Sequence, residues 1–337
     1  MVVERHMHRR EFIAASVISA MLPLTARAQS QASLPRIVMY SATEPLSSMY
    51  ENSYNRYIRA LFAEMRRLGL VESKSLKIER YGRETADVRS KATIAAIVDS
   101  NPNLIFTVGA GAVFKQATNT IPIATFSIDP IREGLVKSIA HPGGNITGVS
   151  FNPEVPIHGK RIALLREMFP PLKRLAFLAT RPVLKNEWGE VRAAAEPQGI
   201  ELSACPIDVP SSEAIYRDPI GKAKDEGADA IMVALDGDPF VNHVLVAKVI
   251  GAAGLPAIYP FTEFVVAGGL MGYATDLVEL NKRMAVDMDA ILKGANPGEI
   301  PFYQPTKFEL SINLKAAKAL SLTVPTTLLT AADVVIE

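Results

Sequence analysis

Short apolar runs of strand length alternate with helical patterns through the first half of the chain. The strand-like runs cover 36–40, 76–81, 103–108 and 121–126. The helical patterns between them cover 50–68, 86–100 and 112–118. The run at 103–108 is mostly apolar without alternation, which is typical of a strand buried on both faces. Strands separated by such helices predict a parallel sheet covered by helices on both sides.

The same alternation restarts after Gly148. The expected helices cover 156–169, 187–198, 211–226 and 239–253. The expected strands cover 174–179, 200–204, 230–235 and 256–259. Gly199, Gly227 and Gly254 each follow a helical pattern, as glycines do at helix C-termini. The predicted fold class is therefore α/β, with two doubly wound parallel-sheet lobes in tandem.

Parallel sheets place ligands beyond the carboxyl ends of their strands, so two facing lobes form a cleft lined by strand-end loops. The candidate ligand-binding residues are Ser41, Gly109, Ala110, Gly111, Asp129, Thr180, Arg181, Asp236, Tyr259, Glu263 and Tyr273. The tyrosines among them carry an aromatic ring with a polar tip, which suits a cleft wall. Packing between elements explains the same tyrosines without a ligand.

Gly109-Ala110-Gly111 follows an expected strand and opens an expected helix. Backbone N–H groups at such a point favour an anion, here a ligand carboxylate. The alternative is a tight turn with no ligand. A dinucleotide fingerprint requires a third glycine where Phe114 stands, so that interpretation fails.

Charged residues at strand ends carry two interpretations each. Asp129 and Asp236 can accept hydrogen bonds from a ligand ammonium, or they can cap the helices that follow. Arg181 can pair with a ligand carboxylate, or it is a solvated surface charge. Asp218 and Asp238 each precede a proline, and helix capping explains both better than ligand binding.

Composition narrows the function. The chain has 337 residues, 48% of them hydrophobic, and 36 Lys and Arg against 35 Asp and Glu. This balance gives no footprint for nucleic acid. The single cysteine, Cys205, excludes an internal disulfide, and the histidines show no metal spacing; we place His141, His158 and His243 at the surface or at caps. We predict no cofactor, no metal and no catalytic residue.

The first residues form an export signal. Arg9-Arg10 precede an apolar run from Phe12 to Leu24, and Ala26-Arg27-Ala28 is a small-x-small cleavage site. The pattern predicts a twin-arginine-like signal peptide over 1–28, cleavage after Ala28 and a periplasmic product. The alternatives are ordinary secretion and an amphipathic cytosolic helix. The run is too short to span a membrane, and we expect a monomer that is not membrane-spanning.

Four segments together resemble one family, the substrate-binding proteins of ABC transporters with the type I periplasmic fold, in the branch that includes tryptophan-binding proteins. The segments are 141–150, 268–273, 291–297 and 305–318. Two positions depart from the family pattern: Thr180-Arg181 stands where an Asn is usual, and Ala274 follows Tyr273 where a Gly is usual.

The resemblance implies lobe 1 over 33–148 plus 271–297 and lobe 2 over 149–270 plus 298–337, joined by a three-segment hinge. It implies a binding protein that captures a small-molecule ligand, an amino acid or aromatic carboxylic acid, and delivers it to an ABC transporter permease. The alternatives are an exported α/β hydrolase using Ser41 or Ser127, and a periplasmic ligand-sensing domain.

Overall fold

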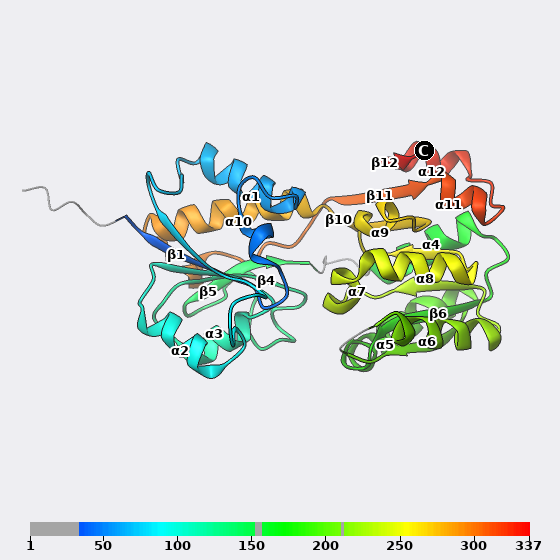
Figure 1. Cartoon of the computed structure of the whole chain (residues 1–337), viewed down its shortest axis with the longest axis horizontal. Coiled ribbons are helices and arrows are strands. Elements are labelled where there is room, and N and C mark those ends of the chain that lie inside the picture. Colours follow the sequence, from blue (N-terminus) through cyan, green and yellow to red (C-terminus); the bar gives the residue numbers. More distant parts are fainter. Residues whose placement is uncertain (1–33, 152–156, 210–211) are drawn as a thin grey trace, which may run out of the picture. The chain divides into compact units, whose positions relative to one another are not determined.

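Two separate β-sheets organise the chain (Figure 1), which the computed structural model describes over residues 34–151, 157–209 and 212–337. The predicted signal peptide at 1–28 lies outside the described residues. Residues 35–337 make up one compact unit. Because strands and helices alternate and the strands are nearly all parallel, the predicted α/β class with two parallel-sheet lobes is confirmed.

The first sheet has five parallel strands in the order β2-β1-β3-β4-β5. Its strands are β1 (Arg36–Tyr40), β2 (Lys77–Tyr81), β3 (Leu104–Val108), β4 (Ile123–Ser127) and β5 (Ile146–Ser150). Its helices are α1 (Arg56–Arg67), α2 (Lys91–Asp99), α3 (Gly111–Ala117) and α10 (Leu277–Leu292). Helices α1 and α10 pack together over one face, and α2 and α3 cover the other (Figure 1).

The second sheet has seven strands in the order β12-β11-β10-β9-β8-β6-β7. Its strands are β6 (Arg174–Thr180), β7 (Glu201–Ile207), β8 (Ala230–Val233), β9 (Ala257–Tyr259), β10 (Met271–Thr275), β11 (Phe308–Asn313) and β12 (Val334–Ile336). Its helices are α4 (Ile157–Met168), α5 (Arg181–Ala195), α6 (Glu213–Asp225), α7 (Gly237–Val241), α8 (His243–Ala253), α9 (Thr262–Val266), α11 (Leu314–Ala319) and α12 (Thr326–Ala331).

Strands β10 and β11 form the one antiparallel pairing among the described strands. After β10 the chain leaves the second sheet and enters α10 of the first lobe. It comes back to the second sheet as β11, so β10 and β11 run in opposite directions. Where they meet, the Asp276 N–H donates to the Lys307 carbonyl at 3.0 Å. The sequence interpretation put 271–275 in lobe 1, whereas these residues pair with β9 and β11 in the second sheet. The chain therefore crosses after Thr275.

Gly148 fixes a second crossing region. Its φ is +157°, and a Cβ there would lie 1.9 Å from the Thr125 carbonyl oxygen, so no side chain fits between β4 and β5. The carbonyl of Gly148 accepts from Tyr303 N–H at 2.9 Å, and Ser150 N–H donates to the Tyr303 carbonyl at 2.8 Å. The returning segment before β11 is thereby held along the edge of the first sheet.

Side-chain caps decide where several helices begin, and they shorten the predicted spans. Asn55 accepts from Tyr57 N–H and Ser90 from Thr93 N–H, so α1 and α2 start at 56 and 91 rather than at 50 and 86. Two predicted caps are wrong. Asp218 lies inside α6, and the cap of α7 is Asp236 rather than Asp238.

Each sheet carries its core on both faces. All four residues of β8 are buried, as are the first four of β3. In the first lobe the rings of Tyr40 and Phe114 meet edge to face with centroids 5.0 Å apart, a contact worth about 0.5–1.5 kcal/mol beyond area burial. These buried strands hold the strand-end loops in fixed places.

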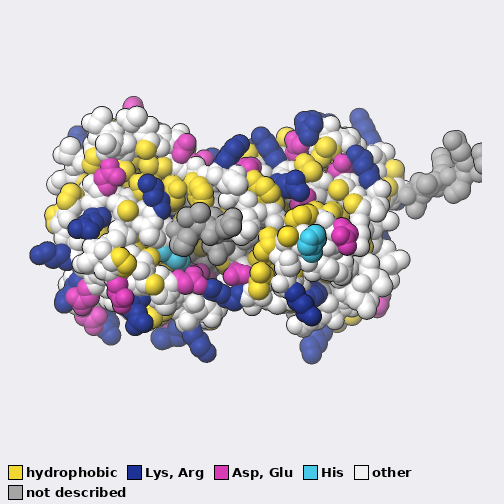
Figure 2. Space-filling view, turned by 180° about the vertical axis from the view of Figure 1, so that it is seen from behind, with side chains coloured by type: hydrophobic (Ala, Val, Ile, Leu, Met, Phe, Trp, Pro, Cys, Tyr) yellow, Lys and Arg dark blue, Asp and Glu magenta, His cyan; other side chains and the backbone are white. Residues whose placement is uncertain are grey.

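Within the described residues, no helix combines the length and the apolar character that a membrane crossing requires. On the face seen in Figure 2, Lys and Arg side chains are interspersed with Asp and Glu. Neither sign of charge gathers there into one patch.

Candidate ligand-binding site

A cavity of about 40 Å³ lies between loops of the two sheets, and we call it the inner cavity. The first lobe lines it with Ile128, Asp129 and Arg132 after β4, and with Phe151 after β5. The second lobe lines it with Ile157, His158 and Arg161 of α4, Glu187 and Glu190 of α5, Leu235 after β8, and Thr275 of β10. Strand ends from both sheets therefore meet here, as the fold predicts for a ligand site.

Arg161 is the most deeply buried charge of the inner cavity, with 1% of its surface exposed. It lies on the inward face of α4, one turn from Ile157 and Leu165. Its Nε donates to the Tyr273 carbonyl at 2.9 Å, while its Nη2 has no hydrogen-bond partner among the described residues. Burial lowers the pKa of Arg161 to about 10, so it remains a cation at neutral pH.

Glu187 and His158 face the same cavity. His158 Nε2 lies 3.8 Å from Glu187 Oε2. Burial raises the pKa of Glu187 to about 7, against the opposing charge of Arg161. Burial, with Arg161 nearby, lowers the pKa of His158 to about 4, so the imidazole is neutral at neutral pH. Glu187 Oε2 and His158 Nδ1 both lack hydrogen-bond partners in the described part of the chain.

The charged side chains at the rim of the inner cavity have more partners than those in its interior. Arg132 of the first lobe forms an ion pair with Glu190 of the second. Asp129 Oδ1 accepts from the N–H groups of Ile131 and Arg132, both at 3.0 Å, so this carboxylate caps the turn after β4. The helix-cap interpretation of Asp129 accounts for one of its oxygens, and the residue also lines the cavity.

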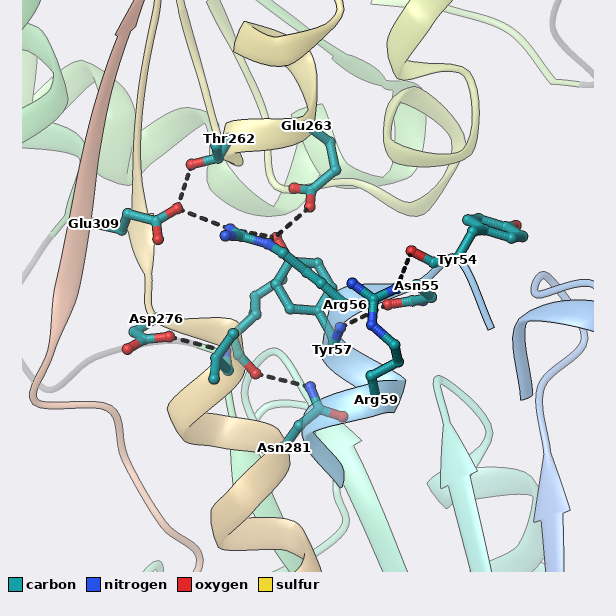
Figure 3. Close-up of polar contacts among 12 residues, drawn as sticks. Tyr54, Asn55, Arg56, Tyr57, Arg59, Thr262, Glu263, Asp276, Asn281 and Glu309 are labelled. Atoms are coloured by element: carbon teal, nitrogen blue, oxygen red, sulfur yellow. Dashed lines mark hydrogen bonds and ion pairs between the residues drawn. The ribbon is translucent and has the colours of Figure 1, made fainter. Parts of the chain in front are cut away.

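A second hollow of about 670 Å³, the outer cleft, lies between the start of α1 and helices α7 and α9. Arg56 bridges it (Figure 3). Its Nη2 lies 2.9 Å from Glu309 Oε1, and its Nε lies 3.7 Å from Glu263 Oε1. The Thr262 hydroxyl donates to the same Glu309 oxygen, and Arg56 Nη2 also donates to the Tyr57 hydroxyl at 3.2 Å. The outer cleft is thus crossed by a network in which Arg56 contacts two carboxylates, while Glu263 Oε2 has no hydrogen-bond partner among the described residues.

Of the predicted site residues, Asp129 lines the inner cavity and Glu263 lines the outer cleft. Thr180 and Asp236 meet each other, because the Thr180 N–H donates to Asp236 Oδ2 at 2.9 Å, and Asp236 caps α7. Ser41 Oγ accepts from the Glu44 N–H at 3.2 Å and closes its own loop. Thr180, Asp236 and Ser41 therefore each make a local structural contact.

The glycine motif is explained by backbone and packing. Gly109 has φ +74°, where glycine is favoured, and a Cβ on Gly111 would stand 2.8 Å from Thr125 Oγ1. Ala110 is buried between them. The helix that follows, α3, has seven residues. None of the three lines either hollow.

The remaining predicted residues contact other side chains. Arg181 is exposed and pairs with Asp208 at 2.6 Å, on a different part of the second lobe from either hollow. Tyr259 is buried and stacks on Phe264 with centroids 5.1 Å apart. Tyr273 stacks on Phe308 at 5.4 Å. These contacts agree with the plainer interpretations of the three residues.

Sequence reasoning missed His158, Arg161 and Glu187. His158 was placed at the surface or at a cap, yet only 12% of its side chain is exposed. A signal existed in α4, because Arg161 falls at the helical spacing of the buried residues Leu164, Leu165 and Met168. A charge on the apolar face of a helix has to be buried, and a buried charge requires a partner.

Two parallel-sheet lobes that share a cavity define the architecture of a type I periplasmic binding protein. The chain belongs to the family of ABC transporter substrate binding proteins, which it matches over residues 52–336. The resemblance seen in the sequence is therefore confirmed.

A curated relative is a tyrosine-binding protein of Clostridioides difficile strain R20291, 24% identical over 261 residues that cover 75% of this chain and 73% of the relative. Among solved structures, the ABC domain in complex with L-Trp from Streptococcus pneumonia superposes with a TM-score of 0.78 at 24% identity, over 90% of this chain and 100% of that one. A conserved domain protein from Vibrio cholerae gives 0.77 at 20% identity, over 90% and 99%.

Members of this family bind small molecules and work with ABC transporters; they are substrate-binding proteins, not enzymes. The hydrolase alternative therefore falls. Neither serine considered as a nucleophile is hydrogen-bonded to a His or a carboxylate within the described residues. Ser41 Oγ contacts the Thr43 hydroxyl and the Glu44 N–H, and Ser127 Oγ has no hydrogen-bond partner there. Nor does any group of three or more His, Cys, Asp or Glu in those residues form a metal site.

Proposed function

We propose that this protein is exported, captures a free amino acid or an aromatic carboxylic acid between its two lobes, and delivers it to an ABC transporter permease. The observation that carries the proposal is the inner cavity, lined from both lobes and containing buried charged atoms without partners among the described residues. Such groups cost free energy until something pairs with them. A solute that pairs with both lobes at once stabilises their closed arrangement.

The comparisons support an amino acid in particular. The curated relative is named for tyrosine and one similar structure holds L-Trp. The walls of the inner cavity support an apolar or aromatic side chain, because Ile128, Phe151, Ile157 and Leu235 line it, and the ring of Phe151 stacks on Phe126 at 5.2 Å. Of the residues predicted from the sequence, Asp129 lines the inner cavity and remains a proposed ligand contact, whereas Glu263 lines the outer cleft.

The test is a thermal-shift panel of the twenty common amino acids and a set of aromatic acids, together with mass spectrometry of small molecules released from the purified protein. A solute that binds only the folded state, at a hundred times its Kd, stabilises by about 2.7 kcal/mol, so a clear rise in the unfolding temperature is expected. If no solute in the panel shifts the transition and no small molecule is released, the proposed function fails.

Export is a separate part of the proposal and has its own test. Changing Arg9 and Arg10 to Lys should block periplasmic accumulation if the twin-arginine route is used, and should leave it intact if general secretion is used. Mass spectrometry of the mature N-terminus locates cleavage, which we expect after Ala28. Recovery of the full-length chain in the cytoplasm would contradict export.

A further inference from the structure

The inner cavity holds two opposite charges that face it without pairing with each other. Arg161 Nη2 and Glu187 Oε2 are both buried atoms without a hydrogen-bond partner among the described residues. No ion pair joins the two side chains in that part of the chain, although each influences the other electrostatically. A cation and an anion held close in one cavity, but out of contact, leave room for a group that touches both.

Each unpaired atom specifies the kind of group that would satisfy it. Arg161 Nη2 offers N–H donors from a fixed, planar cation, which match a carboxylate. Glu187 Oε2 is an acceptor on an acidic side chain, which matches an ammonium. The neutral ring of His158 adds Nδ1, another buried atom with no partner among the described residues. A carboxylate and an ammonium joined through one carbon are the head group of an α-amino acid.

The size of the inner cavity agrees with a head group. About 40 Å³ is several times the roughly 10–15 Å³ that one water needs on the same measure, so a small polar group fits. A whole aromatic amino acid is larger. Its side chain therefore requires the apolar lining residues or the lobes to move, as hinged lobes do.

We propose that Arg161 and Glu187 form a zwitterion-reading pair, Arg161 binding the carboxylate and Glu187 the ammonium of a free α-amino acid. This inference rests on the proposed function and narrows it, because an aromatic carboxylic acid without an amine leaves Glu187 unpaired in the cavity. The pair thus selects amino acids over acids of the same shape.

Isothermal titration calorimetry with matched compounds tests this without changing the protein. The probes are L-phenylalanine, L-tyrosine and L-tryptophan, each against its deaminated analogue: 3-phenylpropanoate, 3-(4-hydroxyphenyl)propanoate and 3-indolepropanoate. L-Leucine against 4-methylpentanoate adds an aliphatic pair. Because charge-assisted hydrogen bonds are worth about 1.5–3 kcal/mol, we expect the best-bound amino acid to bind at least about tenfold tighter than its analogue.

Glu187→Gln is the matching variant and Glu196→Gln its control, since Glu196 directly follows the same helix, pairs with Arg192 and lines neither hollow. We expect E187Q to reduce the amino-acid preference to less than about fivefold, and E196Q to keep it. Circular dichroism and unfolding temperature establish that both variants fold. Should E187Q fail to fold, the wild-type comparison of amino acids with their analogues decides alone.

The outcomes separate this inference from the proposed function. If the deaminated acids bind as tightly as the amino acids, or if E187Q keeps the full preference, the zwitterion pair is overturned while solute capture stands. If only a solute without an α-amino group binds, the result is the same. If no solute of any class binds, the proposed function itself fails.

Discussion

The inner cavity and the outer cleft both lie between the two lobes, and both contain an arginine opposite acidic residues, yet they differ in how those charges are satisfied. In the outer cleft, Arg56 contacts Glu309 at 2.9 Å and Glu263 at 3.7 Å. In the inner cavity, Arg161 and Glu187 each keep an atom that has no partner among the described residues. In the larger hollow the arginine contacts both carboxylates, although Glu263 Oε2 has no hydrogen-bond partner in the described part of the chain, whereas in the smaller hollow the arginine and the glutamate form no ion pair with each other there.

This difference separates a hollow whose arginine connects the lobes from the one that we propose binds a solute. A charge network that pairs with itself gains little from a ligand, which would have to displace existing contacts. Unpaired buried charges gain the full value of their missing contacts when a ligand enters. By volume the outer cleft is the better candidate for the binding site. The unpartnered charged atoms of Arg161 and Glu187 favour the inner cavity instead.

The largest contrast is expected for affinity when each arginine is removed. Arg161→Gln should weaken binding of the best amino acid by about a hundredfold, because truncating one partner of a buried charge pair costs about 2–5 kcal/mol. Arg56→Gln should change the affinity by less than about fivefold, since its partners are the protein's own carboxylates. Calorimetric titration of both variants measures this. Equal losses would remove the distinction between the two hollows.

Removing the charge of Glu187 should raise the stability of the ligand-free protein, in contrast to the loss of affinity expected for Arg161→Gln. Its pKa is raised from 4.5 to about 7 on folding, so the carboxylate destabilises the fold increasingly as pH rises through this interval. E187Q should therefore gain stability over the wild type, by an amount on the order of 2 kcal/mol above pH 7, and this gain should vanish near pH 4.5. Urea denaturation at pH 5 and pH 8 tests it, with E196Q as control. A gain that does not depend on pH would argue against a buried, unpaired Glu187.

Amino-acid affinity should rise with pH for the same reason. A bound ammonium favours the ionised form of Glu187, so affinity should increase about tenfold between pH 6 and pH 8. His158 stays neutral over this range because its pKa is about 4. The other charged groups around Glu187 are Arg161, Glu190, Asp236 and Arg132. Titrations at several pH values should give a flat profile for E187Q; a flat profile for the wild type would contradict the proposal.

The smallest effect, a change in stability, is expected when the ion pairs of Arg56 in the outer cleft are removed. Arg56→Gln leaves Glu309 and Glu263 without their cation. We expect the free energy of unfolding to fall by about 1 kcal/mol or less, because the arginine side chain is 38% exposed. The difference from wild type should shrink in 1 M NaCl. Arg59→Gln is the control, since the side chain of Arg59 donates to the Ser53 and Tyr54 carbonyls of its own lobe and forms no ion pair within the described residues. A loss as large for Arg59 would show that the bridge between lobes is not what matters.

The layered fold was within reach of sequence reasoning because it depends on periodicity. Buried strands such as β3 and β8 are apolar along their length, and glycines end several helices, so both sheets and most helices were predicted. Boundaries depended on local chemistry that periodicity does not carry. The expected helix at 239–253, for example, is two helices, α7 and α8, that meet at Asn242.

The candidate site was harder to predict because strand-end position says where a residue lies and not what its side chain contacts. Asp236 and Thr180 lie at strand ends, yet they satisfy each other. Arg161 lies in the second turn of a helix rather than in a strand-end loop, and it lines the cavity because α4 packs with that face inward. Helical spacing signals that Arg161 is buried, but the groups that face it are set by the tertiary fold, so only the folded structure identifies them.

One guanidinium faces two ways. Arg161 donates to the carbonyl of Tyr273 through Nε, lines the inner cavity, and keeps Nη2 without a hydrogen-bond partner among the described residues. Tyr273 lies two residues before β10 ends and the chain passes to the other lobe. Because a guanidinium is rigid and planar, a guest that pulls it toward itself also pulls on the strand beside the crossing. If a solute binds Arg161, this one side chain therefore connects the solute to the strand that leads into the crossing between the lobes.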